Sequence, residues 1–136
     1  MELEAQLATV PLLSGLDDRI RAGLARIGKR RTFSAGETIV QEGTKGTALY
    51  VMLRGHVRVE RGGTEVGQLG PEDFFGELAL LEEEPRSASV IAIDEVECLL
   101  FPVWEFRALL GEQPQIAVPI MQALIKRLHR QERHSS

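Results

Sequence analysis

Residues 74–88 read Phe74-Phe75-Gly76-Glu77-Leu78-Ala79-Leu80-Leu81-Glu82-Glu83-Glu84-Pro85-Arg86-Ser87-Ala88. Glycine lets a backbone approach a ligand closely because it has no Cβ. The run from Leu78 to Leu81 predicts one helical turn, whose free N–H groups at Gly76, Glu77 and Leu78 would form an anion site. Arg86 supplies a planar guanidinium suited to a phosphate, and the Glu77 carboxylate accepts hydrogen bonds from sugar hydroxyls. The segment therefore predicts a nucleotide site.

The same segment resembles the phosphate-binding cassette of cyclic nucleotide-binding domains. The resemblance rests on Phe75-Gly76-Glu77-Leu78-Ala79-Leu80-Leu81 followed by Pro85-Arg86-Ser87-Ala88. That family includes the sensor domain of catabolite activator protein-type regulators, protein kinase A regulatory subunits and cyclic-nucleotide-gated channels. The spacing of Glu42-Gly43, Gly46, Leu49-Tyr50 and Gly55 also matches the β-roll of the family, so the resemblance extends from about Leu12 to about Arg130.

Length and composition indicate an ordinary globular protein. The chain has 136 residues, 43% hydrophobic and 26% charged, which predicts a single domain over residues 1–136. A net charge of −4 argues against a broad nucleic-acid or anionic-membrane surface. We therefore expect neither nucleic acid nor membrane among the partners.

The N-terminus and the single cysteine point to a cytoplasmic protein. The N-terminus is acidic and has no long apolar run, so no signal peptide is predicted. No stretch approaches the ~18 apolar residues of a spanning helix. Cys98 alone can form neither an internal disulfide nor an iron–sulfur site, and its alternating apolar surroundings predict a small buried hydrophobe.

Hydrophobic periodicity divides the chain into helices, strands and helices again. Helical spacing over about 3–28 includes one face formed by Leu16, Ile20, Leu24 and Ile27, with a candidate N-cap in Ser14–Asp18 and a stop at Gly28. From about 30 to 101, short alternating runs are separated by glycine turns, among them the Gly62-Gly63 hairpin signal. Helix returns over about 102–132 with two apolar groups. These are the cluster Trp104, Phe106, Leu109 and Leu110, and the stripe Ile116, Ile120, Leu124 and Leu128, widened by Val118, Met121 and Ile125.

The predicted fold class is mainly β with flanking helices (α+β). The short, regularly spaced strands imply an all-β sandwich or barrel. The resemblance implies more specifically a double-stranded β-helix, or jelly-roll β-roll, with N-terminal helices and a C-terminal helical lid. We expect no DNA-binding domain within the chain.

The resemblance implies a role for each residue of the cassette. Glu77 would accept a hydrogen bond from the ribose 2′-hydroxyl, and a side chain at Gly76 would block the sugar–phosphate. Arg86, with the backbone and hydroxyl of Ser87 and the backbone of Ala88, would hold the phosphate. The expected ligand-binding residues are Gly76, Glu77, Leu78, Arg86, Ser87, Ala88, Val59 and Val66, with Leu128, Arg130 or Gln131 of the last helix capping the base.

Simpler interpretations of these residues stay open. Arg86 could pair on the surface with Glu82, Glu83 or Glu84, which contributes only about 0–1 kcal/mol. Glu77 could be a first-turn carboxylate that complements the helix dipole, and Val59 and Val66 could be ordinary core residues. The three glutamates also lower the potential near an anion, although salt screens part of that effect. Serine at position 87 admits cyclic AMP or cyclic GMP, and we favour cyclic AMP.

Two other classes of function are weighed against nucleotide binding. A cupin-type metal enzyme needs clustered histidines, whereas His56 is alone among the strands, so neither a metal nor catalysis is expected. An interaction module of the same fold could work without a ligand. The sequence favours a cyclic nucleotide sensor without its own effector and without a cofactor, which relays movement of its C-terminal helices to an unknown protein partner. The last helix often mediates dimer contact in the family, so a homodimer is one expectation.

Overall fold

The computed structural model describes residues 2–7, 11–71, 73–76 and 85–135, although not every side chain of the helices. Contacts between Cα atoms divide the chain into two units, Ile27–Arg107 and the combination of Met1–Arg26 with Ala108–Ser136. The first unit contains the strands, and the second contains most of the helices. The prediction of a single domain stays a prediction.

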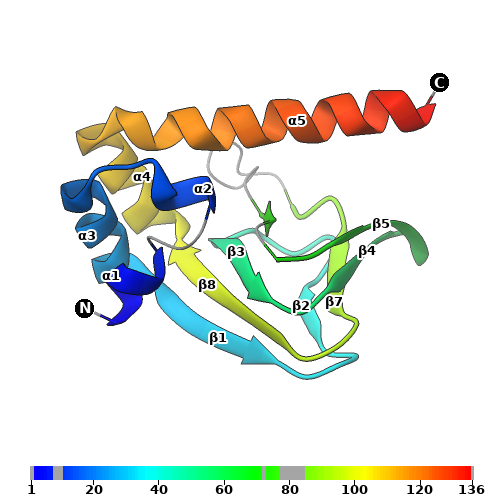
Figure 1. The fold of residues 1–136 in the computed structure, drawn as a ribbon. Coiled ribbons are helices and arrows are strands. Elements are labelled where there is room, and N and C mark those ends of the chain that lie inside the picture. Colours follow the sequence, from blue (N-terminus) through cyan, green and yellow to red (C-terminus); the bar gives the residue numbers. More distant parts are fainter. Residues whose placement is uncertain (1, 8–10, 72, 77–84, 136) are drawn as a thin grey trace. The chain divides into compact units, whose positions relative to one another are not determined.

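Within the described residues, the strands form two antiparallel sheets of four strands each (Figure 1). One sheet has the order β1 (Lys29–Phe33), β8 (Val96–Pro102), β3 (Ala48–Arg54) and β6 (Phe74–Phe75). The other has the order β2 (Thr38–Val40), β7 (Ser89–Ala92), β4 (Val57–Arg61) and β5 (Thr64–Leu69). This sandwich with flanking helices confirms the predicted fold class.

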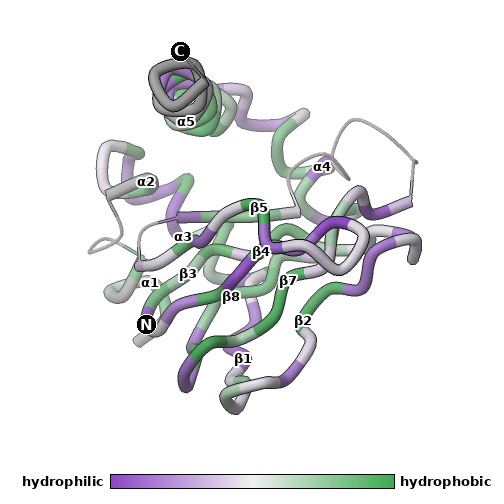
Figure 2. Tube along the Cα trace, turned by 90° about the vertical axis from the view of Figure 1, so that its right-hand side faces the viewer, coloured by the Kyte–Doolittle hydropathy of each residue, from purple (hydrophilic) through white to green (hydrophobic). Residues whose placement is uncertain are grey.

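Side chains from both sheets form one hydrophobic core. Its buried members are Val40, Met52, Val57, Phe75, Val90, Ala92 and Val96, with Phe33, Ile39, Tyr50 and Leu69 packed against them. The four residues of β7 are all buried, which matches the hydrophobic colouring along this strand in Figure 2. Each large side chain buried in this way stabilises the fold by roughly 1.5–3 kcal/mol.

Two glycines form the turn of the β4–β5 hairpin. Arg61 pairs with Thr64, so Gly62 and Gly63 alone form the connection. Their φ angles are +61° and +83°, a region that a two-residue turn with the right twist requires and that side chains disfavour. The prediction of a hairpin at Gly62-Gly63 is confirmed.

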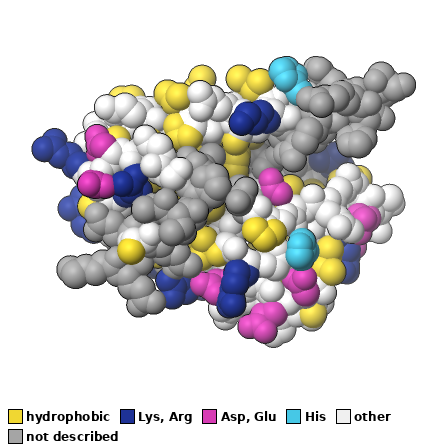
Figure 3. Space-filling model, viewed as in Figure 1, with side chains coloured by type: hydrophobic (Ala, Val, Ile, Leu, Met, Phe, Trp, Pro, Cys, Tyr) yellow, Lys and Arg dark blue, Asp and Glu magenta, His cyan; other side chains and the backbone are white. Residues whose placement is uncertain are grey.

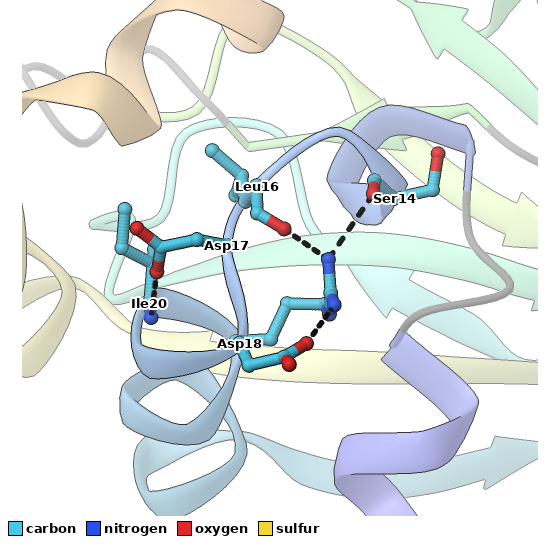
Figure 4. Close-up of polar contacts among 6 residues, drawn as sticks. Ser14, Leu16, Asp17, Asp18 and Ile20 are labelled. Atoms are coloured by element: carbon cyan, nitrogen blue, oxygen red, sulfur yellow. Dashed lines mark hydrogen bonds and ion pairs between the residues drawn. The ribbon is translucent and has the colours of Figure 1, made fainter.

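The helices that precede β1 include one, α3, whose start is capped by a polar side chain. They are α1 (Glu2–Leu7), α2 (Pro11–Ser14) and α3 (Asp18–Ile27). Asp17 Oδ1 accepts the Ile20 N–H at 3.0 Å, which confirms the predicted N-cap (Figure 4). Arg21 donates back to the carbonyl oxygens of Leu16 and Ser14 and pairs with Asp18, so the α2–α3 connection is held by one side chain.

In the C-terminal helices, the residues of the two predicted apolar groups do not all lie on one buried face. These helices are α4 (Val103–Glu112), a 3₁₀ turn η2 (Pro114–Ile116) and α5 (Ala117–Ser135). Phe106 and Leu109 of α4 are buried, but Trp104 is 71% exposed, with the Arg107 guanidinium 5.3 Å from its ring centroid. Two residues apart on a helix means about 200° of rotation, so Trp104 and Phe106 cannot share a face.

The same geometry separates the apolar residues of η2 and α5. Ile116 and Ile120 are buried, whereas Val118, Met121 and Ile125 are more than half exposed. The three residues predicted to widen the apolar stripe therefore lie outside its buried part. No helix in the described part of the chain is long and apolar enough to cross a membrane.

We predict that Gly55→Ala lowers the free energy of unfolding by more than about 2 kcal/mol. Gly55 has φ +88°, which costs a non-glycine residue about 1–2 kcal/mol. An added Cβ would also lie 2.9 Å from Val96 Cα and even closer to the Glu95 carbonyl oxygen. Gly36→Ala is the control, because Gly36 has φ +87° with no atom within 4 Å of its Cβ position. Equal losses in urea denaturation would contradict the steric part of the prediction.

Candidate phosphate-binding site

Gly76 lies directly after β6, against the backbone of β3. Its φ is +86°. A Cβ at this position would lie 2.7 Å from the Ala48 carbonyl oxygen and 2.7 Å from Arg86 Nη1. The absence of a side chain therefore makes room for a neighbouring guanidinium, in addition to the close approach of a ligand that the sequence predicted.

Arg86 is fixed by its side chain and by its backbone. Its Nη2 donates to the Ala48 carbonyl oxygen at 2.8 Å. Its N–H donates to the Thr44 carbonyl oxygen at 2.7 Å, and its own carbonyl oxygen accepts the Gly43 N–H at 2.9 Å. With the bridge between Lys45 and Pro85, these contacts form a short antiparallel pairing that brings Arg86 next to Gly76.

Tyr50 lies on β3 and connects the neighbourhood of Arg86 with the hydrophobic core. Its ring stacks on Phe75, with centroids 4.9 Å apart and planes at 11°. Burial raises the pKa of Tyr50 above its ordinary value, and the positive charges of Arg86 and Arg31 offset part of that effect. The phenol is thus an electrostatic neighbour of Arg86 and joins the strand before Gly76 to the core.

Ser87 and Ala88 continue the segment toward β7. Ser87 is exposed, and its carbonyl oxygen accepts a hydrogen bond from Arg61 Nε at 3.2 Å. Ala88 is half-buried. Ser89 is buried, and its Oγ accepts the Glu42 N–H at 2.9 Å, so this hydroxyl helps to hold the loop before Gly43.

Val59 and Val66 have different environments. Val59 is half-buried on β4, opposite Gly67 of β5 and Val90 of β7. Val66 of β5 is 53% exposed, so the interpretation of it as an ordinary core residue is wrong. Their role at the base of a nucleotide stays a prediction.

Other predicted residues lie outside the described part of the site. These are Glu77 and Leu78 of the cassette, together with Glu82, Glu83 and Glu84 of its acidic tip. Leu128, Arg130 and Gln131 belong to α5, but their side chains are not among those that the structure describes. Their expected roles stay predictions.

Three further reactive side chains are described by the structure, Cys98, His56 and Asp94. Burial raises the pKa of the Cys98 thiol to about 12, which confirms its interpretation as a small buried hydrophobe. His56 Nδ1 lies 2.8 Å from Asp94 Oδ2, and hydrogen bonds from His56 lower the pKa of that carboxyl. Among the described residues, no three His, Cys, Asp or Glu side chains are grouped so that they could hold a metal ion.

Sequence reasoning did not find three groups that lie around Arg86 and its segment, namely the Ala48 carbonyl, Tyr50 and Arg61. The Ala48 carbonyl is a backbone atom 38 residues away from Arg86, and it has no signal in the sequence. Tyr50 could have been found, since it is the only tyrosine of the chain and lies in a strand otherwise rich in aliphatic residues. Arg61 directly precedes the hairpin glycines, where a basic residue usually has no structural meaning.

Residues 30–113 match the family model described as the cyclic nucleotide-binding domain. Because the match covers more than half of the chain, the protein belongs to the cyclic nucleotide-binding domain family. This family is regulatory rather than catalytic.

Known relatives agree with this assignment. The chain is 40% identical over 110 residues to the cAMP-dependent protein kinase regulatory subunit of Aspergillus fumigatus, covering 79% of this chain and 27% of that protein. The crystal structure of the Thermus thermophilus catabolite activator protein is similar with TM-score 0.77 and 33% identity, covering 91% of this chain and 61% of that one. The regulatory subunit of a cAMP-independent protein kinase A from Trypanosoma cruzi, bound to guanosine, is similar with TM-score 0.74 and 34% identity, covering 84% and 41%.

The chain is much shorter than the curated relatives it matches. It spans 15%, 29% and 27% of the length of three of them, a cGMP-dependent protein kinase, a potassium channel protein and a cAMP-dependent kinase regulatory subunit. The comparisons therefore concern this domain within larger and functionally diverse proteins.

We predict that Arg86→Leu raises the pKa of Tyr50 further. The positive charge of Arg86 favours the phenolate, so its removal leaves burial less opposed. The ultraviolet absorbance of the phenolate measures this pKa directly, because Tyr50 is the only tyrosine. Since the folded-state pKa is raised, Tyr50 contributes stability that is complete below about pH 10 and is lost as the pH rises through the folded-state value.

The matched control for this titration is Arg107→Leu, which removes the same charge beside Trp104. It should leave the Tyr50 titration unchanged. An unchanged titration in Arg86→Leu as well would mean that Arg86 does not lie near Tyr50 in solution.

Proposed function

We propose that the chain is a cyclic nucleotide sensor that binds cyclic AMP through Arg86 and the backbone around Gly76. The observation that carries this proposal is the placement of the Arg86 guanidinium against the backbone of Gly76, where a side chain would collide with it. A charge-assisted contact from a guanidinium to a phosphate in a partly desolvated site contributes roughly 1.5–3 kcal/mol. The simpler interpretation, a surface ion pair, contributes only about 0–1 kcal/mol.

The geometry of the guanidinium suits a cyclic phosphodiester. A guanidinium has five N–H donors in one plane, so it can hold a carbonyl oxygen and a phosphate oxygen together. Nη2 is directed to Ala48 by its hydrogen bond, which fixes the plane of the group. The phosphate would meet an oriented donor instead of a flexible side chain, and this lowers the entropy cost of binding.

The remaining ligand contacts follow from the resemblance of the cassette. Glu77 would accept the ribose 2′-hydroxyl, and Gly76 and Leu78 would supply backbone donors. Val59 and Val66 would line the base, and the exposure of Val66 makes it accessible for that purpose. Leu128, Arg130 or Gln131 would cap the base from the last helix.

Cyclic AMP is favoured over cyclic GMP by the relatives and by residue 87. Similar proteins are named as cAMP-dependent kinase regulatory subunits and as a cyclic AMP receptor protein. Guanine-selective members often carry threonine where this chain has Ser87. Serine retains a hydroxyl, so cyclic GMP is the second ligand to test.

The proposed output is a change in the helices that follow β8, read by a protein partner in the cytoplasm. Helix α4 continues directly from β8, and Phe106 packs edge-on against Phe101 with centroids 5.8 Å apart. Ligand binding would shift the population of helix positions by its differential affinity for them. The proposed role includes neither catalysis nor a metal or cofactor.

A homodimer through α5 is a second part of the proposal. Val118, Met121 and Ile125 follow one another by three and four residues, and each is more than half exposed. Figure 3 shows hydrophobic side chains along this helix. Spacing of this kind forms the seam of paired helices.

A ligand-independent interaction module of the same fold is the alternative function. Two observations favour it: the Glu82–Glu84 run in the cassette, and the similarity to a regulatory subunit described as cAMP-independent. Three carboxylates beside an anion site weaken anion binding. Direct titration separates the two functions.

We predict that calorimetric titration detects cyclic AMP binding and that Arg86→Leu weakens it at least about tenfold, since the lost contact exceeds ~1.4 kcal/mol. Arg107→Leu is the matched control and should bind as the wild-type protein does. Absence of binding of both cyclic AMP and cyclic GMP at millimolar concentration would sink the sensor proposal. An unaffected Arg86→Leu would move the phosphate site elsewhere.

We predict that Met121→Lys converts a dimer into a monomer in sedimentation experiments, because a buried lysine in the seam is left without a partner. The control is Gln122→Lys, which adds the same charge at an exposed neighbouring position. A wild-type protein that is monomeric at all concentrations would overturn the dimer.

A further inference from the structure

We propose that Arg61, at the end of β4, is a positioning residue for the phosphate-binding segment Arg86–Ala88, assisted by Glu42. This inference rests on the proposed function of that segment. Arg61 Nε donates to the Ser87 carbonyl oxygen at 3.2 Å, across 26 residues of sequence. Arg61 belongs to the β4–β5 hairpin, not to the cassette.

Because the peptide bond is planar, this contact at the Ser87 carbonyl also sets the direction of the next N–H group. In a trans peptide, the C=O and the following N–H point in opposite directions. A fixed Ser87 carbonyl therefore fixes the direction of the Ala88 N–H. In the same way, the Gly43 N–H that binds the Arg86 carbonyl oxygen at 2.9 Å fixes the direction of the Ser87 N–H. The Ser87 and Ala88 N–H groups, which are expected to bind the phosphate, are thus both oriented by hydrogen bonds to the carbonyl oxygens of their own peptide units.

The positive charge of Arg61 has a second effect on the Ala88 N–H, in addition to setting its direction. A cationic donor on a carbonyl polarises the peptide, and chains of hydrogen bonds strengthen one another. The Ala88 N–H consequently becomes a better donor toward an anion. A neutral donor in place of Arg61 would orient the peptide but polarise it less.

Glu42 forms hydrogen bonds both to the β4–β5 hairpin and to Ser89, the residue that follows the Arg86–Ala88 segment. Its Oε1 accepts the Gly62 N–H at 2.9 Å, and its own N–H donates to Ser89 Oγ at 2.9 Å. The hairpin tip, the 42–44 loop and the 86–89 segment therefore form one network. Gly62, with its positive φ, allows the chain to turn so that its N–H faces Glu42.

The test compares Arg61→Ala, Arg61→Lys and Arg58→Ala in two measurements. Arg58 lies on the same strand and carries the same charge, but its Nε pairs with Glu60 at 2.6 Å. The first measurement is calorimetric affinity for cyclic AMP. We expect Arg61→Ala to weaken it about fivefold, Arg61→Lys to recover most of the loss, and Arg58→Ala to change it less than about twofold.

The second measurement needs no ligand. Amide hydrogen exchange by NMR should show the Gly43 and Arg86 N–H groups exchanging about fivefold faster in Arg61→Ala, with unchanged rates in β8. Arg58→Ala should leave both rates as they are. Wild-type protein that binds no nucleotide would end the proposed function, and the exchange rates alone would then decide whether Arg61 holds the segment.

Three results would overturn the inference. Unchanged exchange at Gly43 and Arg86 in Arg61→Ala would show that the contact does not hold the segment. An equal loss of affinity in Arg58→Ala would show that only the positive charge of the strand matters. Faster exchange throughout the sandwich would equally count against it, because that pattern belongs to a general loss of stability.

Discussion

The arrangement of the site depends on one contact, the hydrogen bond from Arg86 Nη2 to the Ala48 carbonyl oxygen. It lies where β3 begins and where Gly76 leaves β6, so three separate parts of the chain meet at one guanidinium. Only glycine fits at position 76, because any Cβ would enter the space of Ala48 and Arg86. The glycine and the arginine of the cassette are therefore one steric unit, although nine residues separate them.

The β-sandwich holds Gly76 and Arg86 in place from both sides of the segment. Stacking between Tyr50 and Phe75 connects the strand before Gly76 to the hydrophobic core. The 43–45 loop holds the other half of the segment through backbone atoms, and the β4–β5 hairpin holds it through the Arg61 side chain. Backbone contacts depend little on side-chain identity, so the loop part of this frame can accept many surface sequences, whereas the hairpin part depends on the residue at position 61.

Local features of the fold could be predicted from the sequence, and long-range contacts could not. Gly62-Gly63 and Asp17 each act within a few residues, where turn and cap chemistry decides the conformation. Arg86 was predicted to be a phosphate ligand from its sequence neighbours, yet its side chain donates to a backbone carbonyl that no sequence pattern marks. Trp104 was misplaced because an apolar residue type was given more weight than its angle around the helix.

That exposed tryptophan has a practical consequence. Trp104 is the only tryptophan of the chain, and it lies in the first turn of α4, a helix whose residues belong partly to each of the two units. Its indole is mostly exposed to solvent and lies beside the Arg107 guanidinium, a cation–π contact. The protein thus carries an intrinsic fluorophore in the first turn of α4, and changes in the surroundings of this helix can be followed in real time without an added label.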